Sequence, residues 1–232
     1  MRQLRLGVIL SAALAWAPLA TARADFDEAA LFKACPGVAA FYAKQSAEKE
    51  PAPVVATDKA RQAALLERVA EDQALRDELV RDMSNAEAIS KVKEVDARNL
   101  AWLKADVERR GFPARAEVGD DGIRAAWLLI QHADTDRAFQ KKALEAFLAE
   151  PERYGVRKDD IALLTDRALV GEGKLQRYGS QFDDKDGRLV LQPVEAPESL
   201  ESRRAAMGLP SMADYACMMQ TMYRREVELT PR

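Results

Sequence analysis

Asp121–Gln140, with the sequence DGIRAAWLLIQHADTDRAFQ, is the stretch on which the predicted fold depends. Its first half is apolar on most sides of a helical wheel, and such a helix is normally surrounded by other core elements. Arg124 and Gln131, seven residues apart, share the one polar strip. His132, the only histidine of the chain, follows in the last turn, where the helix dipole favours the imidazolium and burial opposes it. We therefore expect a buried central helix with a polar group at its C-terminal end.

Two long amphipathic patterns fill residues 58–110 before this helix and predict two further helices. Ser84 and Asn85 supply a break and a cap between them, and Gly111 stops the second one. The turn GDDG at residues 119–122 then leads into the central helix, with an aspartate placed to cap it.

The rest of the chain predicts more helices and one hairpin. Residues 176–182 and 188–194 have strand character and are joined by a turn that ends in Asp-Gly. A helical pattern with the buried face Phe139, Ala143, Ala146 and Phe147 follows Asp136 and is ended by Pro151 and Gly155. Further helical patterns cover residues 158–170, 197–207 and 211–225. The predicted fold is mainly α: a single-domain, helical bundle-like array with one small β-hairpin near residues 176–194.

The first 24 residues have the pattern of an export signal peptide. Arg2 and Arg5 precede an apolar run at residues 6–17, and Ala22–Ala24 forms an A-x-A cleavage site. The run is too short to span a bilayer comfortably, although retention as an anchor is the alternative. We expect a protein that is periplasmic or secreted, without stable membrane insertion after cleavage. The net charge of −3 does not favour nucleic acid or an anionic membrane as a partner.

Residues 25–57 are predicted to form a helical arm and linker, and residues 58–232 the helical domain. The segment 48–57 contains two prolines and no periodicity, which is typical of a linker. Cys35 and Cys217 form an even pair in an oxidising compartment, which favours a disulfide. Two buried free thiols are the alternative. The sequence has no Walker loop, dinucleotide fingerprint or G-x-S-x-G elbow, so we expect no cofactor.

Several motifs occur in one order along residues 58–215. They are Asp96-x-x-Asn99, Gly111-Phe112-Pro113, Val118-Gly119-x-Asp121-Gly122, Ala126–Asp134, Phe139-Gln140, Leu164-Thr165-Asp166-Arg167, Gln176-x-Tyr178-Gly179-x-Gln181, and Arg203-Arg204-Ala205 with Gly208-Leu209. This pattern resembles domain-of-unknown-function family 6624, uncharacterised bacterial proteins. Ser180 stands where that family usually has threonine, and both cysteines lie outside the resemblance. The resemblance implies a shared fold and no function.

The polar residues around His132 are the candidate site. We select His132, Asp134 and Asp166 as candidate catalytic residues. On a continuous helix His132 and Asp136 would share a face, so that the carboxylate could orient the imidazole. The candidate ligand-binding residues are Gln131, Asp136, Gln140, Arg167, Gln176, Tyr178, Gln181, Asp96 and Asn99.

Structural roles compete with each of these assignments. Asp134 or Asp136 can cap the next helix, while His132 packs in the core with one ring nitrogen satisfied. Asp166 and Arg167 are more often an ion pair, and Tyr178 can simply be part of a strand edge. We expect no metal, because His-x-Asp-x-Asp is not a specific spacing and there is no second histidine. An oxygen-rich calcium or manganese site is the alternative.

Two classes of function follow. The first is an exported domain that binds a small molecule, a peptide or an envelope ligand in a polar pocket around His132, without catalysis. The second is a hydrolytic enzyme in which His132 is the general acid or base and an aspartate orients it. A Ser-His-Asp arrangement is a minority option, because Ser180 and His132 would have to meet.

Overall fold

The computed structural model describes residues 27–47 and 52–229. The predicted signal peptide lies outside them. The protein is mainly helical with one small sheet, which confirms the predicted fold class. No helix in these ranges is both long enough and apolar enough to cross a membrane.

The described chain forms two compact units. Residues 52–164 make up one, here called the continuous unit, and residues 27–47 with 165–229 make up the other, here called the discontinuous unit. This division differs from the predicted arm followed by one domain from residue 58. The division into separate domains remains a prediction.

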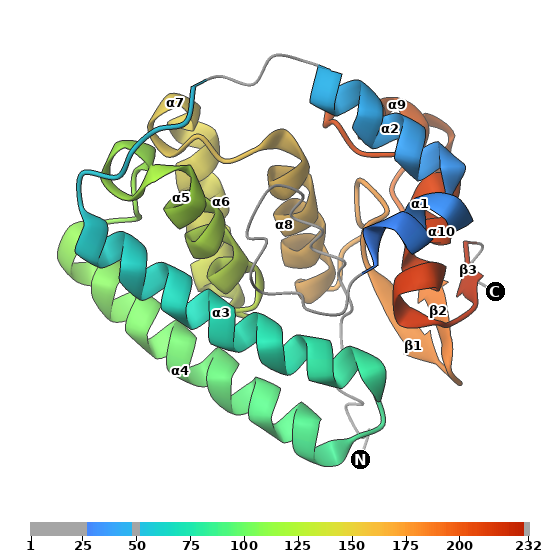
Figure 1. The fold of residues 1–232 in the computed structure, drawn as a ribbon, viewed down its shortest axis with the longest axis horizontal. Helices are drawn as coiled ribbons and strands as arrows, with labels where there is room; N and C mark the ends of the chain where they lie inside the picture. Colours follow the sequence, from blue (N-terminus) through green and yellow to red (C-terminus); the bar gives the residue numbers. More distant parts are fainter. Residues whose placement is uncertain (1–26, 48–51, 230–232) are drawn as a thin grey trace. The chain divides into compact units, whose positions relative to one another are not determined.

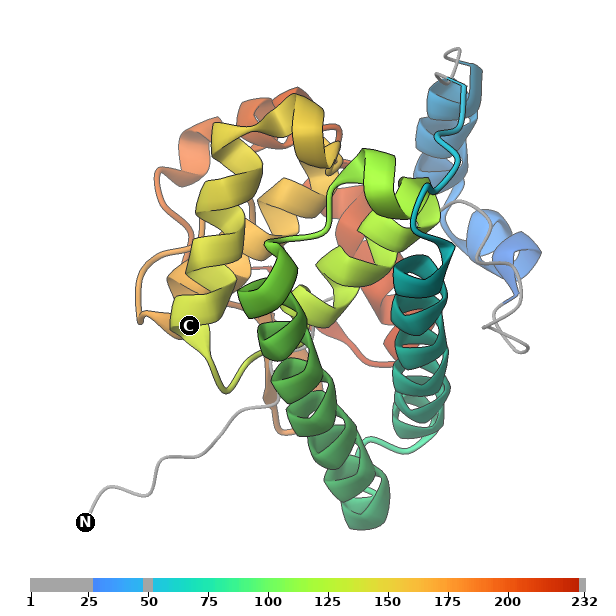
Figure 2. The same ribbon diagram turned by 90° about the vertical axis from the view of Figure 1, so that its left-hand side faces the viewer.

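Two long helices form one side of the continuous unit. Helices α3 (Lys59–Arg81) and α4 (Ala86–Arg110) lie side by side and are joined by a short connection, as Figures 1 and 2 show. Asn85 caps α4 as predicted, accepting from the backbone N–H groups of the second and third helical residues. Gly111 ends α4 at a φ of 75°.

Helix α5 (Arg115–Gln131) is the central helix predicted from the sequence, and it packs mainly on α3. It is kinked at Gly119, which has a φ of 70°. A Cβ atom there would lie 2.8 Å from the carbonyl oxygen of Val54, so the close approach of the chain before α3 requires glycine. The predicted aspartate cap is wrong, because Asp120 instead accepts from the Val54 N–H at 2.8 Å.

The continuous unit is completed by α6 (Arg137–Ala149), α7 (Pro151–Tyr154) and the first half of α8 (Lys158–Gly171). The Trp127 indole in α5 donates to the carbonyl oxygen of Asp160 at 3.0 Å, which attaches the central helix to the start of α8. Trp127 is completely buried, as expected for packing.

The discontinuous unit combines four complete helices and the second half of α8 with the sheet. The helices are α1 (Glu28–Ala34), α2 (Pro36–Ala47), α9 (Leu200–Ala206) and α10 (Met212–Tyr223), and a short 3-10 turn, η1, covers Pro197–Ser199. Helix α1 ends at Ala34 and α2 begins at Pro36. Cys35 lies at this break and is bonded to Cys217 of α10, with the two Cα atoms 5.9 Å apart.

The sheet has the strand order β1-β2-β3. Strands β1 (Phe182–Lys185) and β2 (Arg188–Leu191) form the predicted antiparallel hairpin, and β3 (Val227–Glu228) adds a parallel edge. The hairpin is shorter than predicted, because residues 176–181 are not a strand. Their backbone N–H groups are largely bonded to side chains instead.

Candidate functional site

The centre of the candidate site is a contact between His132 and Asp72. Helix α5 ends at Gln131, and His132 is its C-terminal cap with φ −90° and ψ 0°. The imidazole Nδ1 lies 2.9 Å from Oδ2 of Asp72, which comes from the buried face of α3. The imidazole is 9% exposed and the carboxylate 2%, so the contact is shielded from water.

Asp72 is held by two further side chains. The Gln73 amide donates to the same oxygen, Oδ2, at 2.7 Å. Arg76, one turn along α3, donates from Nε to Oδ1 at 3.0 Å. A second nitrogen of that guanidinium, Nη2, donates to Asp96 of α4. Both oxygens of the Asp72 carboxylate are therefore fixed in direction.

The neighbouring charges decide the ionisation of Asp72. Burial by itself raises the pKa of this carboxyl, but the charges of His132 and Arg76 outweigh that effect and hold the pKa well below its usual range. Burial raises the pKa of Asp96, and the charge of Asp72 adds to the rise while Arg76 opposes it. Asp72 is therefore ionised at neutral pH.

An anionic Asp72 fixes the tautomer of the histidine. Since both oxygens of the carboxylate can only accept, Nδ1 must carry the proton and donate it to Oδ2. In the neutral imidazole the other nitrogen, Nε2, carries the lone pair, and it has no hydrogen bond from any residue in the described ranges. This arrangement leaves Nε2 available as a proton acceptor.

Three donor groups of this cluster lie close enough to be considered as metal ligands. One atom each from Asp72, Asp96 and His132 lies within 4.8 Å of the other two. Arg76 already donates to both carboxylates, so a cation there would have to replace the guanidinium. We therefore assign the charge balance of the cluster to Arg76 and do not assign a metal.

Two of the predicted aspartates shape the turn after His132. Asp136 caps α6 by accepting from the Phe139 N–H at 3.0 Å, and Asp134 accepts from Arg137 at 2.7 Å. Neither has a hydrogen bond to the imidazole within the described part of the chain. The predicted sharing of one helical face by His132 and Asp136 is wrong, because the chain leaves the helix between them.

Gln140 holds the end of the central helix. Its amide nitrogen donates to the carbonyl oxygens of Ile130 and Gln131, each at 3.1 Å. These carbonyls belong to the last turn of α5, where the regular helical donors run out, and that of Ile130 also accepts from the Ala133 N–H at 3.1 Å. Gln140 therefore fixes the turn from which His132 projects.

Two other predicted ligand-binding residues have buried polar atoms without partners. Gln131 is completely buried, and neither its amide nitrogen nor its amide oxygen has a hydrogen bond in the described structure. Asn99, also buried, accepts from Arg68 at 3.3 Å, but its own nitrogen donates to none of the described residues. Buried polar atoms without hydrogen-bond partners are uncommon in folded proteins and normally have a structural or functional cause.

A shallow hollow lies beside α4 and the turn that follows His132. It is lined by Ala97, Leu100, Ala101, Lys104, Ala105, Glu108 and Thr135. Neither His132 nor Asp72 is among these residues, so this hollow is not the polar pocket expected from the sequence.

The remaining candidates belong to the discontinuous unit, where Asp166 organises a loop. Its completely buried carboxylate accepts from the backbone N–H groups of Arg177, Tyr178 and Ser180, at 2.7, 2.9 and 3.0 Å, and from the Ser180 hydroxyl at 2.9 Å. Burial raises the pKa of Asp166, and these donors oppose the rise. The Asp166 carboxylate thus holds the backbone of the loop at residues 176–181 in place.

Two glutamines close the same loop. The Gln176 amide accepts from the Gln181 N–H at 2.8 Å and donates to the Gln181 carbonyl oxygen at 3.0 Å. Arg167 approaches the Gln181 amide oxygen at 3.5 Å. The prediction that these residues and His132 line one pocket remains a prediction.

A model of a family of unknown function, DUF6624, matches residues 59–228. The chain belongs to this family. No curated protein and no solved structure matches it. The part that matches DUF6624 contains Asp72, Asp96 and His132. It also contains Cys217, which the resemblance seen in the sequence did not reach, whereas Cys35 lies outside.

Asp72 and Arg76 are functional residues that were not predicted from the sequence. The signal for Asp72 was present, because it falls on the buried face of α3 in phase with Leu65, Val69 and Leu79. A carboxylate in the apolar phase of an amphipathic helix requires a partner. Which partner it has depends on how α3 and α5 pack, and periodicity does not contain that information.

Proposed function

We propose that this DUF6624 protein is an exported hydrolase in which His132 is the general base that activates water. The observation that carries the proposal is the distance of 2.9 Å between Nδ1 of His132 and Oδ2 of Asp72. A buried carboxylate at Nδ1 orients the ring and leaves Nε2 to take a proton from water.

The charges of the cluster favour proton transfer to His132. With a neutral imidazole, the two carboxylates of Asp72 and Asp96 face the single positive charge of Arg76. When Nε2 takes up a proton, the four groups become electrically balanced. The imidazolium that forms during catalysis is thus stabilised by charges that are already in place.

The same charges indicate the class of substrate. A site with surplus negative charge repels anionic substrates, so we infer neutral esters or amides. Water is the nucleophile in this proposal, because Asp72 is the only described residue with a hydrogen bond to the His132 side chain.

Two observations support export. The first 24 residues have the composition of a signal peptide, and the Cys35–Cys217 disulfide belongs to oxidising compartments such as the periplasm or the exterior. We infer that the mature protein begins near Asp25.

A second candidate function, binding without catalysis, is favoured by Gln131. Its buried amide offers one donor and one acceptor with no partner in the described structure, a pattern complementary to another amide. In this reading the His132–Asp72 contact only holds the helices, and the bound molecule is released unchanged.

Acylation by diethyl pyrocarbonate tests the proposed base, because this reagent attacks the unprotonated ring nitrogen and the chain has one histidine. We expect native protein to be modified once, at His132, with loss of any hydrolysis found in a panel of neutral esters and amides. His132→Gln is expected to lack both the modification and the hydrolysis. The matched control is Asp136→Asn, which changes the nearby helix cap and keeps the His132–Asp72 contact. Undiminished hydrolysis by His132→Gln would contradict the proposed function.

A further inference from the structure

We propose that Arg76 and Asp96 are a positioning pair that sets, through Asp72, how readily His132 takes up a proton. The catalytic role of this pair rests on the proposed function. Its effect on proton uptake by His132 does not, because that uptake can be measured without a substrate.

The geometry gives each oxygen of Asp72 a separate task. Oδ1 accepts from Nε of Arg76 at 3.0 Å, while Oδ2 faces Nδ1 of His132 at 2.9 Å. Arg76 is itself held from the other side by Asp96 of α4. The guanidinium therefore cannot turn away from Asp72 without also breaking its contact with Asp96.

The burial of these groups makes their charges effective. The Asp72 carboxylate is 2% exposed, and the Arg76 and Asp96 side chains are 24% and 22% exposed. Charges that are partly removed from water interact more strongly than charges at an open surface. Arg76 and Asp96 thus act on the imidazole with opposite signs, the first opposing its positive charge and the second favouring it.

The other charged groups near His132 are already paired. In the turn that follows it, Asp134 is bonded to Arg137 and Asp136 to Lys104 of α4. Helix α3 contributes Asp72 and Arg76, and α4 contributes Asp96. We therefore expect proton uptake by His132 to change when Arg76 or Asp96 is replaced.

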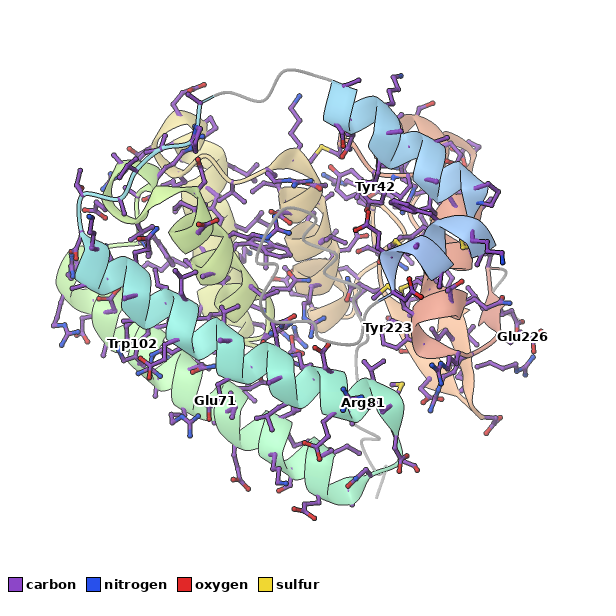
Figure 3. All side chains as sticks on the ribbon, in the orientation of Figure 1. Tyr42, Glu71, Arg81, Trp102, Tyr223 and Glu226 are labelled. Carbon is purple, nitrogen blue, oxygen red and sulfur yellow. A yellow bond between two sulfur atoms is a disulfide. The ribbon has the colours of Figure 1, made fainter. Side chains whose placement is uncertain are left out.

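A second ion pair between the same two helices supplies a matched control. Glu71 and Arg98 are the sequence neighbours of the cluster, and they form an ion pair between α3 and α4. Figure 3 labels Glu71 on α3. Both side chains are about half exposed, so this pair ties the helices without a strong effect on a buried ring.

The experiment follows the imidazole signals of His132 by nuclear magnetic resonance during a pH titration of full-length protein without a histidine tag. Because the chain has one histidine, the signals need no assignment. For Arg76→Gln we expect the titration midpoint of His132 to rise by roughly one pH unit, and for Asp96→Asn to fall by a similar amount. Arg98→Gln is expected to leave it unchanged.

Unchanged midpoints in both Arg76→Gln and Asp96→Asn, or shifts in the same direction, would overturn the proposal. Arg76→Lys keeps the positive charge and is expected to titrate close to the parent. If Arg76→Gln does not fold, Arg76→Lys and Asp96→Asn decide the matter, because the predicted fall in Asp96→Asn stands by itself. Opposite shifts without any hydrolysis would support this pair and count against the proposed function, so the two failures are distinguishable.

Discussion

Asp72 and His132 are 60 residues apart in the chain, yet their side chains meet at 2.9 Å. The contact joins the middle of α3 to the end of α5, the pair of elements with the most extensive packing in the continuous unit. It therefore supports the fold as well as the proposed chemistry, and stability measurements can separate these two contributions.

Replacement of His132 by alanine measures how much this residue contributes to the stability of the fold. In His132→Ala the buried Asp72 carboxylate keeps Arg76 and Gln73 but loses one donor, so we expect the free energy of unfolding in urea to fall by about 2 kcal/mol at neutral pH. Lys93→Gln, an exposed change in α4, is the control. An unchanged or higher stability would mean that the fold does not need this histidine, as expected for a site kept at the expense of stability.

The depressed pKa of Asp72 predicts that the protein loses stability as the pH falls. The pKa of Asp72 in the folded protein is depressed, so its contribution is fully present above the ordinary carboxyl pKa of about 4 and is lost as the pH falls further. Asp72→Asn has no such group. We expect urea unfolding between pH 6 and pH 3 to show a smaller loss of stability in Asp72→Asn than in the parent, and parallel curves would contradict this.

The raised pKa of Asp160 predicts the opposite effect, a loss of stability as the pH rises. Burial, followed by the charge of Asp159, raises the pKa of Asp160 from its ordinary range to about 7, and Arg157 and Arg124 oppose the rise. A raised carboxyl pKa disfavours the ionised form in the fold, so this group costs stability as the pH rises from about 4 to about 7.

Asp160→Asn removes that cost. At pH 8 we expect the variant to be more stable than the parent by at most about 4 kcal/mol, and the difference should shrink towards pH 4. Thermal unfolding over this pH range measures it. Asp159→Asn, the partly buried neighbour in the same turn, should gain less. A difference that does not vary with pH would show that Asp160 is not the titrating group.

Asp166→Ala is expected to release the loop at residues 176–181. The change leaves three backbone N–H groups without their acceptor, at a cost of about 3 kcal/mol. Hydrogen exchange should show fast amide exchange at Tyr178 and Ser180, while the continuous unit keeps its protection. Asp183→Asn is the surface control. Protected amides in Asp166→Ala would mean that the loop is held by other contacts.

Removal of the disulfide is expected to lower the stability of the discontinuous unit. The bond closes a loop with a sequence separation of 182, for which chain entropy gives an upper figure of roughly 5 kcal/mol. The comparison is between the parent and Cys35→Ser with Cys217→Ser, both in urea without reductant. If reductant lowers the midpoint of the double variant as much as that of the parent, the effect does not come from this bond.

Local signals in the sequence predicted most of the helices. Asn85 and Gly111 gave the ends of α4 correctly, because caps and stops act within a few residues. The strand at 176–182 was wrong for a non-local reason: the N–H groups that would form a ladder are bonded to Asp166 of α8. Alternating side chains do not reveal where backbone donors find their acceptors.

In the candidate site, too, local patterns predicted some residues and missed a contact between distant segments. His132 was found from its own helix, and Asp96 from the family motif. The partner of His132 was expected at Asp136, since residues i and i+4 meet on a continuous helix. Gln140 bonds to the last carbonyls of α5, the chain turns there, and Asp72 contacts the ring instead. Such a contact depends on helix packing across 60 residues, which periodicity cannot specify.

The bond between Cys35 and Cys217 also sets an order of events during synthesis. Cys35 emerges from the ribosome early, and its partner follows 182 residues later, so the first thiol stays unpaired while nearly all of the chain is made. With two cysteines in the sequence, no mispairing within one molecule exists, and the competing bond joins two molecules. Correct maturation therefore depends on how dilute the newly made chains are, and crowded expression will yield covalent dimers rather than scrambled monomers.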